Sequence, residues 1–380
     1  MQFTPDVLSN TRRELARREI TRIFARDRLT LSEAGALADG FFNYLSTPKG
    51  GTLPGRLYGK IAPEIDAALR ERWDVLEVLF GTTGKTALLS QHPVLVLDGL
   101  AGTGKSNILG LIAFALYAAK IPLAAFAANE GARAALDKQL DGIGEFSTTL
   151  TDGNLPDTLP ETGCILVDEA ALLPFHTLHQ LSDWAKAAPS RCIALSCDRR
   201  QFAPYPDSVA LLASLPAVTL SAIVRQKDPV LRQTVQLAAL GLGQNALKAL
   251  PAKTLAFGLS PVDAAEALRL WLLIDKRIET WQMAPHWQQP GLIRIYSTNA
   301  EFVALAAGTL RRVGLPADYA HLLEAGQGSN SDAVFLYLDA EITDRALYVG
   351  LTRAKQTLLL VSAAASLEAL KIQETFALSS

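Results

Sequence analysis

The sequence predicts an α/β fold with two parallel-sheet domains, preceded by an α-helical N-terminal domain. From residue 93 onward, short apolar runs alternate with helix-compatible segments, the pattern of parallel strands buried on both faces. The chain has 380 residues and is 49% hydrophobic, which is enough material for more than one packed core. A Leu/Ala-rich stretch interrupts the alternation before residue 290, so one sheet is expected on each side of it.

Residues 1–90 are expected to form a helical accessory domain. An arginine-rich segment, residues 11–28, carries apolar side chains at helical spacing. These side chains are Ala16, Ile20, Ile23 and Phe24. Further helices are expected over residues 32–45 and from Pro63. Acidic residues interrupt the arginines, which favours a solvated surface helix over a nucleic-acid contact. These helices are the expected surface for a protein partner.

Three segments make up the rest of the chain. Residues 91–228 are expected to form the first sheet domain, with strands at 93–98, 122–128, 164–168, 192–196 and 217–220. Residues 229–290, rich in Leu and Ala, are expected to form a helical bridge. Residues 291–380 are expected to form the second sheet domain, with strands at 292–296, 333–338 and 356–362.

Composition narrows the class of protein. A formal net charge of −2 argues against a protein that coats a polyanion, but it leaves room for a local basic groove. Cys164, Cys192 and Cys197 fall in or beside apolar runs, which favours buried thiols over a zinc site with His176 or His179. The sequence shows neither an apolar signal core nor a membrane-length apolar run. We therefore expect a cytoplasmic protein with no membrane contact.

A glycine-rich segment follows the first apolar strand. Residues 99–106 read Gly-Leu-Ala-Gly-Thr-Gly-Lys-Ser, which is the G-x-x-x-x-G-K-S pattern of a phosphate-binding loop. The turn residues Gly99, Gly102, Thr103 and Gly104 would direct backbone N–H groups at a polyphosphate. Lys105 would reach the β and γ oxygens, and Ser106 would hold Mg²⁺. A plain strand-to-helix turn is disfavoured, because strand, loop, lysine, hydroxyl and helix occur in that order.

Two carboxylates end the strand expected at 164–168. The sequence Cys-Ile-Leu-Val-Asp-Glu places Asp168 and Glu169 at the edge of a parallel sheet, where ligands bind. Asp168 would complete the Mg²⁺ shell, and Glu169 would take a proton from the water that attacks the γ-phosphate. Alone, the pair is equally well explained as an acidic turn. Together with the glycine-rich loop it predicts ATP hydrolysis.

Further segments resemble motifs of superfamily 1 helicases. Residues 197–204, Cys-Asp-Arg-Arg-Gln-Phe-Ala-Pro, resemble their motif III, and the Arg-Gln pair at 225–226 resembles motif IV. Residues 348–354, Tyr-Val-Gly-Leu-Thr-Arg-Ala, are similar to motif VI. The resemblance implies that Gln201 senses the γ-phosphate and that Arg225 and Arg353 are arginine fingers. Guanidinium groups suit the charge that develops on a transferring phosphoryl group.

Two segments match that family less closely. Residues 127–136 resemble motif Ia, which grips single-strand phosphates, with Asn129 in place of the common Thr. Residues 326–334 resemble motif V, whose Gln327 and Gly328 are implied to contact the nucleotide. The Thr, His and Lys expected there are replaced by Leu322, Glu324 and Ala325. Losing cationic contacts weakens the grip on a nucleic-acid backbone.

The resemblance covers residues 93–362 with the motifs in order, and it is greatest to the RecD-like branch. That branch's SH3-like insertion and its Gln-containing adenine motif are not found. The resemblance implies two RecA-like domains with ATP between them and movement along single-stranded nucleic acid, DNA rather than RNA. Phe202 and Tyr205 would stack on bases, although core packing explains Phe202 equally well. The alternatives are a viral-type RNA helicase in a host cytoplasm, or a nucleotide-dependent switch or assembly ATPase that no longer tracks a strand.

Overall fold

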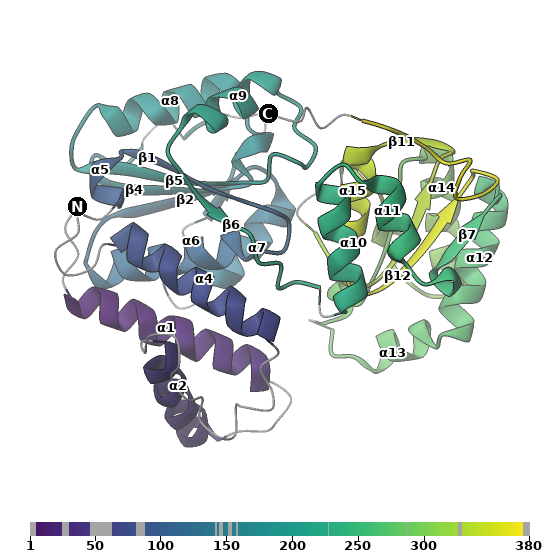
Figure 1. The fold of residues 1–380 in the computed structure, drawn as a ribbon, viewed down its shortest axis with the longest axis horizontal. Coiled ribbons are helices and arrows are strands. Elements are labelled where there is room, and N and C mark those ends of the chain that lie inside the picture. Colours follow the sequence, from purple (N-terminus) through teal and green to yellow (C-terminus); the bar gives the residue numbers. More distant parts are fainter. Residues whose placement is uncertain are drawn as a thin grey trace. The chain divides into compact units, whose positions relative to one another are not determined.

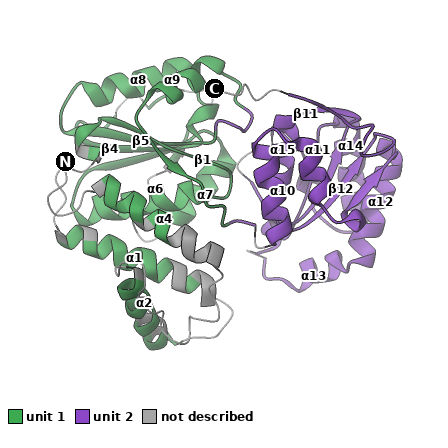
Figure 2. Ribbon diagram, in the orientation of Figure 1, with its two compact units in different colours: residues 1–198, 203–224 green, residues 199–202, 225–380 purple. Residues whose placement is uncertain are grey.

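The protein folds into two compact units (Figure 2). Unit 1 consists of residues 1–198 and 203–224, and unit 2 consists of residues 199–202 and 225–380. The computed structural model describes residues 5–24, 30–45, 63–80, 88–140, 143, 147–150, 154–156, 159–226, 228–286, 288–325 and 329–374. Within these ranges, none of the helices combines the length and apolar character needed to cross a bilayer.

Unit 1 is built on a six-stranded sheet in the order β3-β2-β4-β5-β1-β6. All its neighbouring strands pair in parallel. The strands are β1 (Val94–Gly99), β2 (Leu123–Ala127), β3 (Ser147–Thr149), β4 (Gly163–Asp168), β5 (Arg191–Cys197) and β6 (Ala217–Leu220). Five of the six were expected. The exception is β3, whose three residues at the sheet edge are too few for a periodic pattern.

Helices cover both faces of this sheet (Figure 1). They are α5 (Leu88–Gln91), α6 (Lys105–Ala118), α7 (Glu130–Leu140), η2 (Ala170–Leu172), α8 (Phe175–Lys186) and α9 (Pro206–Ser214). Successive strand residues point to opposite faces. In β4, Cys164 and Leu166 therefore join the core under α6, whereas Ile165 and Val167 join the core under α8. The run of apolar residues in β4 follows from burial on both sides.

The N-terminal helices belong to the same compact unit. They are α1 (Pro5–Phe24), α2 (Leu31–Leu45) and α4 (Pro63–Phe80). Leu15 of α1 and Leu76 of α4 share one core with Leu109 and Ile112 of α6. This differs from the separate domain expected for residues 1–90. The reason is that α6 is apolar on nearly every side, so its face away from the sheet also needs apolar partners.

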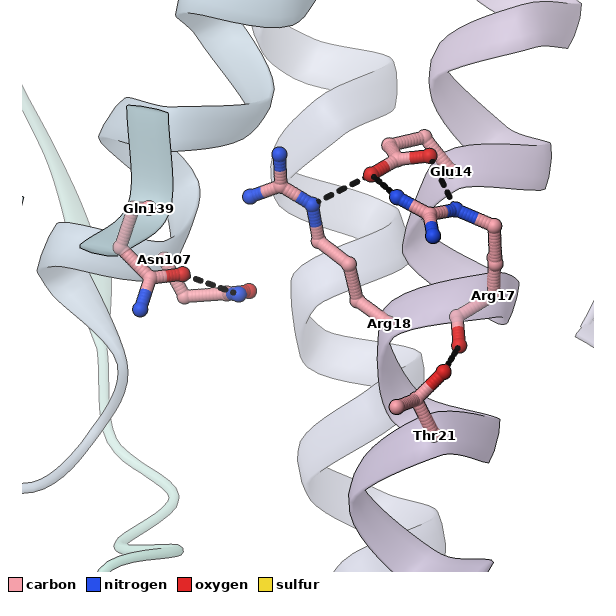
Figure 3. Close-up of polar contacts among 6 residues, drawn as sticks. All are labelled: Glu14, Arg17, Arg18, Thr21, Asn107 and Gln139. Atoms are coloured by element: carbon pink, nitrogen blue, oxygen red, sulfur yellow. Dashed lines mark hydrogen bonds and ion pairs between the residues drawn. The ribbon is translucent and has the colours of Figure 1, made fainter. Parts of the chain in front are cut away.

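A polar cluster also lies where α1 meets α6 (Figure 3). Glu14 accepts hydrogen bonds from Arg17 at 2.7 and 2.8 Å and from Arg18 at 2.7 Å. Burial alone would raise the pKa of Glu14, but the two arginines outweigh it and hold the pKa below 4.5. A Cβ atom on Gly110 of α6 would lie 2.7 Å from Cβ and 2.9 Å from the carbonyl oxygen of Gln139 in α7, and 2.9 Å from the guanidinium of Arg18. Glycine at this position therefore lets α7 approach α6 closely.

Unit 2 is built on a five-stranded sheet in the order β7-β12-β10-β8-β9. Its strand pairs are also parallel. The strands are β7 (Leu255–Phe257), β8 (Ile293–Ser297), β9 (Ala320–Leu322), β10 (Ser331–Leu338) and β12 (Ala354–Ser362). A second, two-stranded sheet pairs β11 (Glu341–Thr343) with β13 (Lys371–Gln373). Two parallel sheets flanked by helices confirm the predicted fold class, with two RecA-like domains.

Helices also pack on the sheet of unit 2. They are α10 (Pro229–Ala239), α11 (Gly243–Ala249), η3 (Ala252–Thr254), α12 (Pro261–Ile274), α13 (Arg277–Met283), η4 (Gln289–Gly291), α14 (Ala300–Arg312), η5 (Ala317–Tyr319) and α15 (Asp344–Thr352). Leu268 of α12 and Phe302 of α14 share a core with Phe335 of β10. The segment expected as a bridge, residues 229–290, thus contributes a strand and core helices to unit 2. Its three-residue strand β7 is hidden in a Leu/Ala-rich sequence that reads as helix.

Candidate nucleotide-binding site

The glycine-rich loop connects β1 to α6 in unit 1. Gly102 and Gly104 have φ angles of 86° and 96°, in the left-handed region that favours glycine. Lys105, the first residue of α6, is buried, and its Nζ donates to the carbonyls of Gly99 at 2.8 Å and Leu100 at 3.2 Å. The loop therefore wraps around the side chain of Lys105 at the N-terminal end of α6, where the helix dipole favours an anion.

The segment after β6 supports this loop from one side. A Cβ atom on Gly99 would lie 2.6 Å from the carbonyl oxygen of Leu220, so only glycine allows β1 and β6 to come this close. Farther along the same segment, the backbone N–H of Val224 donates to the carbonyl of Gly102 at 2.9 Å. Glycine at 99 is thus required by packing.

The loop serine and the strand-end aspartate meet directly. Ser106 Oγ donates to Asp168 Oδ2 at 2.7 Å, and Ser196 Oγ of β5 donates to Asp168 Oδ1. The sheet order explains this contact, because β5 lies between β1 and β4 and all three strands end at the same edge. In the part of the chain that the structure describes, no three His, Cys, Asp or Glu residues cluster as a metal site. A hydroxyl and a carboxylate fit Mg²⁺, which usually takes its remaining ligands from phosphates and water.

Glu169 has an unusual backbone conformation. Its φ and ψ angles are 57° and 44°, a left-handed conformation that is uncommon for residues other than glycine. The N–H of Glu169 donates to Asp168 Oδ1 at 3.1 Å and to Ser196 Oγ at 3.2 Å. Strained residues of this kind cluster at functional sites. The side chain is half-buried, so it stays accessible while the backbone is fixed beside the carboxylate of Asp168.

Gln201 lies in a short segment that interrupts the sequence of unit 1 but belongs to unit 2. Residues 199–202 belong to unit 2, where the guanidinium of Arg345 donates to the carbonyl of Gln201 at 2.9 Å. Arg200 Nε donates to the carbonyl of Ala239, just after the last turn of α10, at 2.9 Å. The side chain of Gln201 is buried. The central residues of the segment that resembles motif III, 199–202, are therefore bonded to helices of unit 2.

The two arginine-finger candidates lie at one end of unit 2. Arg353 is 1% exposed, and its guanidinium donates to Val349 O at 2.9 Å, to Ser329 O at 2.8 Å and to Thr352 Oγ1 at 3.0 Å. Arg225 donates to Thr352 O at 3.3 Å. Arg353 directly precedes β12, so both guanidinium groups lie at the amino edge of this parallel sheet.

The remaining candidates lie elsewhere. Asn129 follows β2, and its Oδ1 accepts a hydrogen bond of 2.8 Å from the N–H of Ala132, so it caps α7. Tyr205 is 40% exposed at the start of α9, while Phe202 is half-buried in unit 2. Gln327 and Gly328 lie outside the described residues.

Sequence reasoning missed two residues of the site in unit 1. Ser196 bonds Asp168, and its signal was a hydroxyl at the end of a buried strand, which is weak when the sheet order is unknown. Arg72 of α4 is buried against Gly104. A single arginine in a helix with many charged residues has no pattern that would single it out. The cysteine prediction agrees with the structure, because all three cysteines are buried.

Comparison with known proteins gives one matching family model, over less than half of the chain, and several partly similar solved structures. A family model described as an AAA domain matches residues 82–255. A structure of two coordinating Pif1 helicases at forked double-stranded DNA is 13% identical to this chain, with a TM-score of 0.44. The match covers 79% of this chain and 93% of the Pif1 chain. Pif1 helicase from Candida albicans is 14% identical, with a TM-score of 0.44 and coverage of 82% and 96%. No curated protein matches this chain.

A viral helicase shows a similar likeness. Arterivirus nonstructural protein 10 is 14% identical, with a TM-score of 0.41. The match covers 80% of this chain and 64% of the viral chain, so this chain spans less than two thirds of that protein. At these identities and TM-scores, these likenesses support no functional assignment.

Proposed function

We propose that this protein is an ATP-dependent translocase or helicase of superfamily 1, in the RecD-like branch, that moves along single-stranded nucleic acid. One observation carries the proposal: Ser106 of the glycine-rich loop and Ser196 both donate to the carboxylate of Asp168, beside the strained Glu169. Loop, cation ligands and base then form a single site for ATP and Mg²⁺. The cytoplasm is the proposed location.

Each group has a proposed role in hydrolysis. Lys105 and the loop N–H groups bind the phosphates, and Ser106 and Asp168 hold Mg²⁺, which neutralises charge on the phosphate oxygens. Glu169 accepts the proton of the attacking water. Outside the glycine-rich loop, Gln201 senses the γ-phosphate in this proposal. Arg225 and Arg353 stabilise the charge that develops on the transferring phosphoryl group. Gln327 and Gly328 are proposed nucleotide contacts from the sequence alone.

The proposed strand contacts rest on the family resemblance and on exposure. Tyr205 presents an exposed ring that suits stacking on successive bases. Phe202 and Asn129 are the other proposed contacts from sequence. DNA is the proposed polymer because the RecD-like branch acts on DNA. The outer faces of the N-terminal helices are the proposed surface for a protein partner.

Steady-state ATP hydrolysis with and without single-stranded DNA or RNA tests this function. We expect strong stimulation by DNA, weaker stimulation by RNA, and almost no hydrolysis by Glu169→Gln, which retains bound ATP. Stronger stimulation by RNA would select the viral-type alternative. Equal turnover in Glu169→Gln and wild type would contradict the assignment of the base.

A second candidate is a nucleotide-dependent switch or assembly ATPase. Leu322, at the end of β9, is 39% exposed, and Glu324 is also exposed. An apolar group and a carboxylate thus replace two of the polar or cationic groups that the family resemblance implies for backbone contact. Hydrolysis that neither polymer changes would favour this candidate.

A further inference from the structure

Arg72 of α4 lies against the glycine-rich loop. Its side chain is 2% exposed. A Cβ atom built on Gly104 would lie 3.0 Å from Cζ and 3.1 Å from Nε of Arg72. Gly104 is also the N-cap residue of α6 and directly precedes Lys105. The guanidinium therefore packs on the residue where the phosphate-binding turn becomes a helix.

The position of Arg72 on its helix is unexpected for a charged residue. Leu76 and Leu79 follow it at a spacing of four and seven residues, and both are fully buried in the core of unit 1. Arg72 thus occupies the apolar stripe of an amphipathic helix. Burying a guanidinium costs free energy that strong polar interactions must offset, so an arginine on this stripe is set apart from its apolar neighbours.

Neighbouring contacts fix α4 beside the loop. The carboxylate of Glu71 accepts from the backbone N–H of Ser221 at 2.7 Å and from that of Ala222 at 3.0 Å. The same segment reaches the loop through the bond from Val224 N–H to Gly102. Farther along α4, Glu77 pairs with Arg12 of α1 at 2.6 Å. These contacts hold the helix, and with it Arg72, in a defined position at the loop.

We infer that Arg72 is a second cationic ligand for the phosphates of the bound nucleoside triphosphate, supplied by the N-terminal helices. The inference rests on the proposed nucleotide site. Arg72, Lys105 and the N-terminal dipole of α6 all present positive charge at one place, and such an arrangement is stabilised by an anion. Planar guanidinium donors match phosphate oxygens well. The N-terminal helices then act as part of the nucleotide site.

Competition against a fluorescent ATP analogue tests this in the full chain with Mg²⁺. The competitors are ATP and inorganic tripolyphosphate, which has no base or sugar. We expect Arg72→Ala to weaken both by the same factor, about tenfold to a hundredfold. Arg72→Lys should restore part of the loss, and the difference from wild type should shrink as salt rises. A merely structural residue would not show this salt dependence.

Arg70→Ala is the matched control from the same helix. Arg70 donates to the hydroxyl of Tyr44 at 2.6 Å and lies over its ring, so it faces α2 and should leave both affinities unchanged. If Arg72→Ala binds both competitors with wild-type affinity, the inference is overturned while the proposed function stands. The same holds if its affinity for ATP falls while its affinity for tripolyphosphate is unchanged. Wild-type protein that binds neither would overturn the proposed function itself. If Arg72→Ala does not fold, Arg72→Gln replaces it, and the same outcomes decide.

Discussion

Each of the two sheets has a strand that leads into a helix, and the two helices differ in how their first turn is capped. In unit 1, β1 leads into α6 through Gly104, and no described side chain caps the first turn of that helix. In unit 2, β8 leads into α14 through Asn299, whose Oδ1 accepts from the N–H of Phe302 at 2.9 Å. Helix N-termini leave N–H groups without partners inside the helix. The first junction has no such cap, whereas the second satisfies one of these groups from within the chain.

The carboxylates at the two edges show the same difference. Asp168 in unit 1 accepts from two hydroxyls, Ser106 and Ser196, which can rotate toward other partners. Asp339 in unit 2 accepts from Thr298 at 2.8 Å and from the amide of Asn299 at 2.9 Å. Because Asn299 also caps α14, it ties that carboxylate to the helix. A shared topology thus leaves one carboxylate bonded by hydroxyls that can rotate and the other bonded to the capping residue of a helix.

Lys105→Ala should break the site of unit 1 and has the largest expected effect. Removing one preorganised donor from a catalytic site costs about a hundredfold to a thousandfold in turnover, and Lys105 also contributes to nucleotide binding. We expect hydrolysis to fall by at least that factor. Steady-state ATPase assays measure it, with Lys138→Ala, an exposed lysine of α7, as the control. Full activity in Lys105→Ala would show that the loop is not the nucleotide site.

Arg353→Ala should instead lower the stability of unit 2. The guanidinium donates hydrogen bonds to Val349, Ser329 and Thr352 from a buried position, and its loss leaves carbonyl acceptors without their charged donor. The expected cost is about 3 kcal/mol in the free energy of unfolding. Urea unfolding measures it, with Arg311→Ala on the exposed side of α14 as the control.

The same variant also tests the arginine-finger assignment. If Arg353 stabilises the transition state, turnover should fall severely while a fluorescent nucleotide binds almost as tightly as to wild type. A variant that loses stability and keeps its turnover would restrict Arg353 to a structural role in unit 2.

The sequence predicted the groups that lie close together along the chain more completely than those that the fold assembles. The glycine-rich loop was recognised because its turn, lysine and hydroxyl occur within eight residues. Ser196 could not be assigned, because its contact with Asp168 depends on β5 lying between β1 and β4. Arg72 could not be assigned either, because its position beside Gly104 depends on the packing of α4 within unit 1. Strand β7 was missed because three residues at an edge show no period.

Domain boundaries were difficult for a related reason. Residues 229–290 read as a separate helical segment, because composition does not reveal which face a helix buries. The core shared by Leu268 and Phe335 and the pairing of β7 with β12 place that segment in unit 2. Likewise, Leu15 and Leu109 share a core across almost a hundred residues of sequence. Local patterns predict helices, and long-range packing decides to which domain each helix belongs.

Asn299→Ala should sharpen the comparison of the two junctions at a smaller cost. The variant removes the cap of α14, which typically costs about 1 kcal/mol, and one of the donors to Asp339. We expect lower stability of unit 2 with unchanged nucleotide affinity, measured by urea unfolding and fluorescent-nucleotide binding. Asn299→Asp should restore the cap but place two carboxylates together. A large loss of nucleotide affinity in Asn299→Ala would mean that this junction also serves a ligand.

The smallest expected effect is a difference between the two units in how their stability depends on pH. Burial and the charge of Arg294 lower the pKa of His321 in unit 2 below 6.5, although Asp318 opposes them. Because the unfolded chain then binds a proton more readily, the contribution of His321 is present above pH 6.5 and is lost as the pH falls below it. Glu14 of unit 1, with its lowered pKa, loses its contribution only below about pH 4.5. Urea unfolding between pH 7 and pH 5 should show that the free energy of unfolding falls less steeply with pH in His321→Gln than in wild type. The control Glu14→Gln should keep the wild-type slope in this range. Equal slopes in His321→Gln and wild type would show that His321 is not the group responsible.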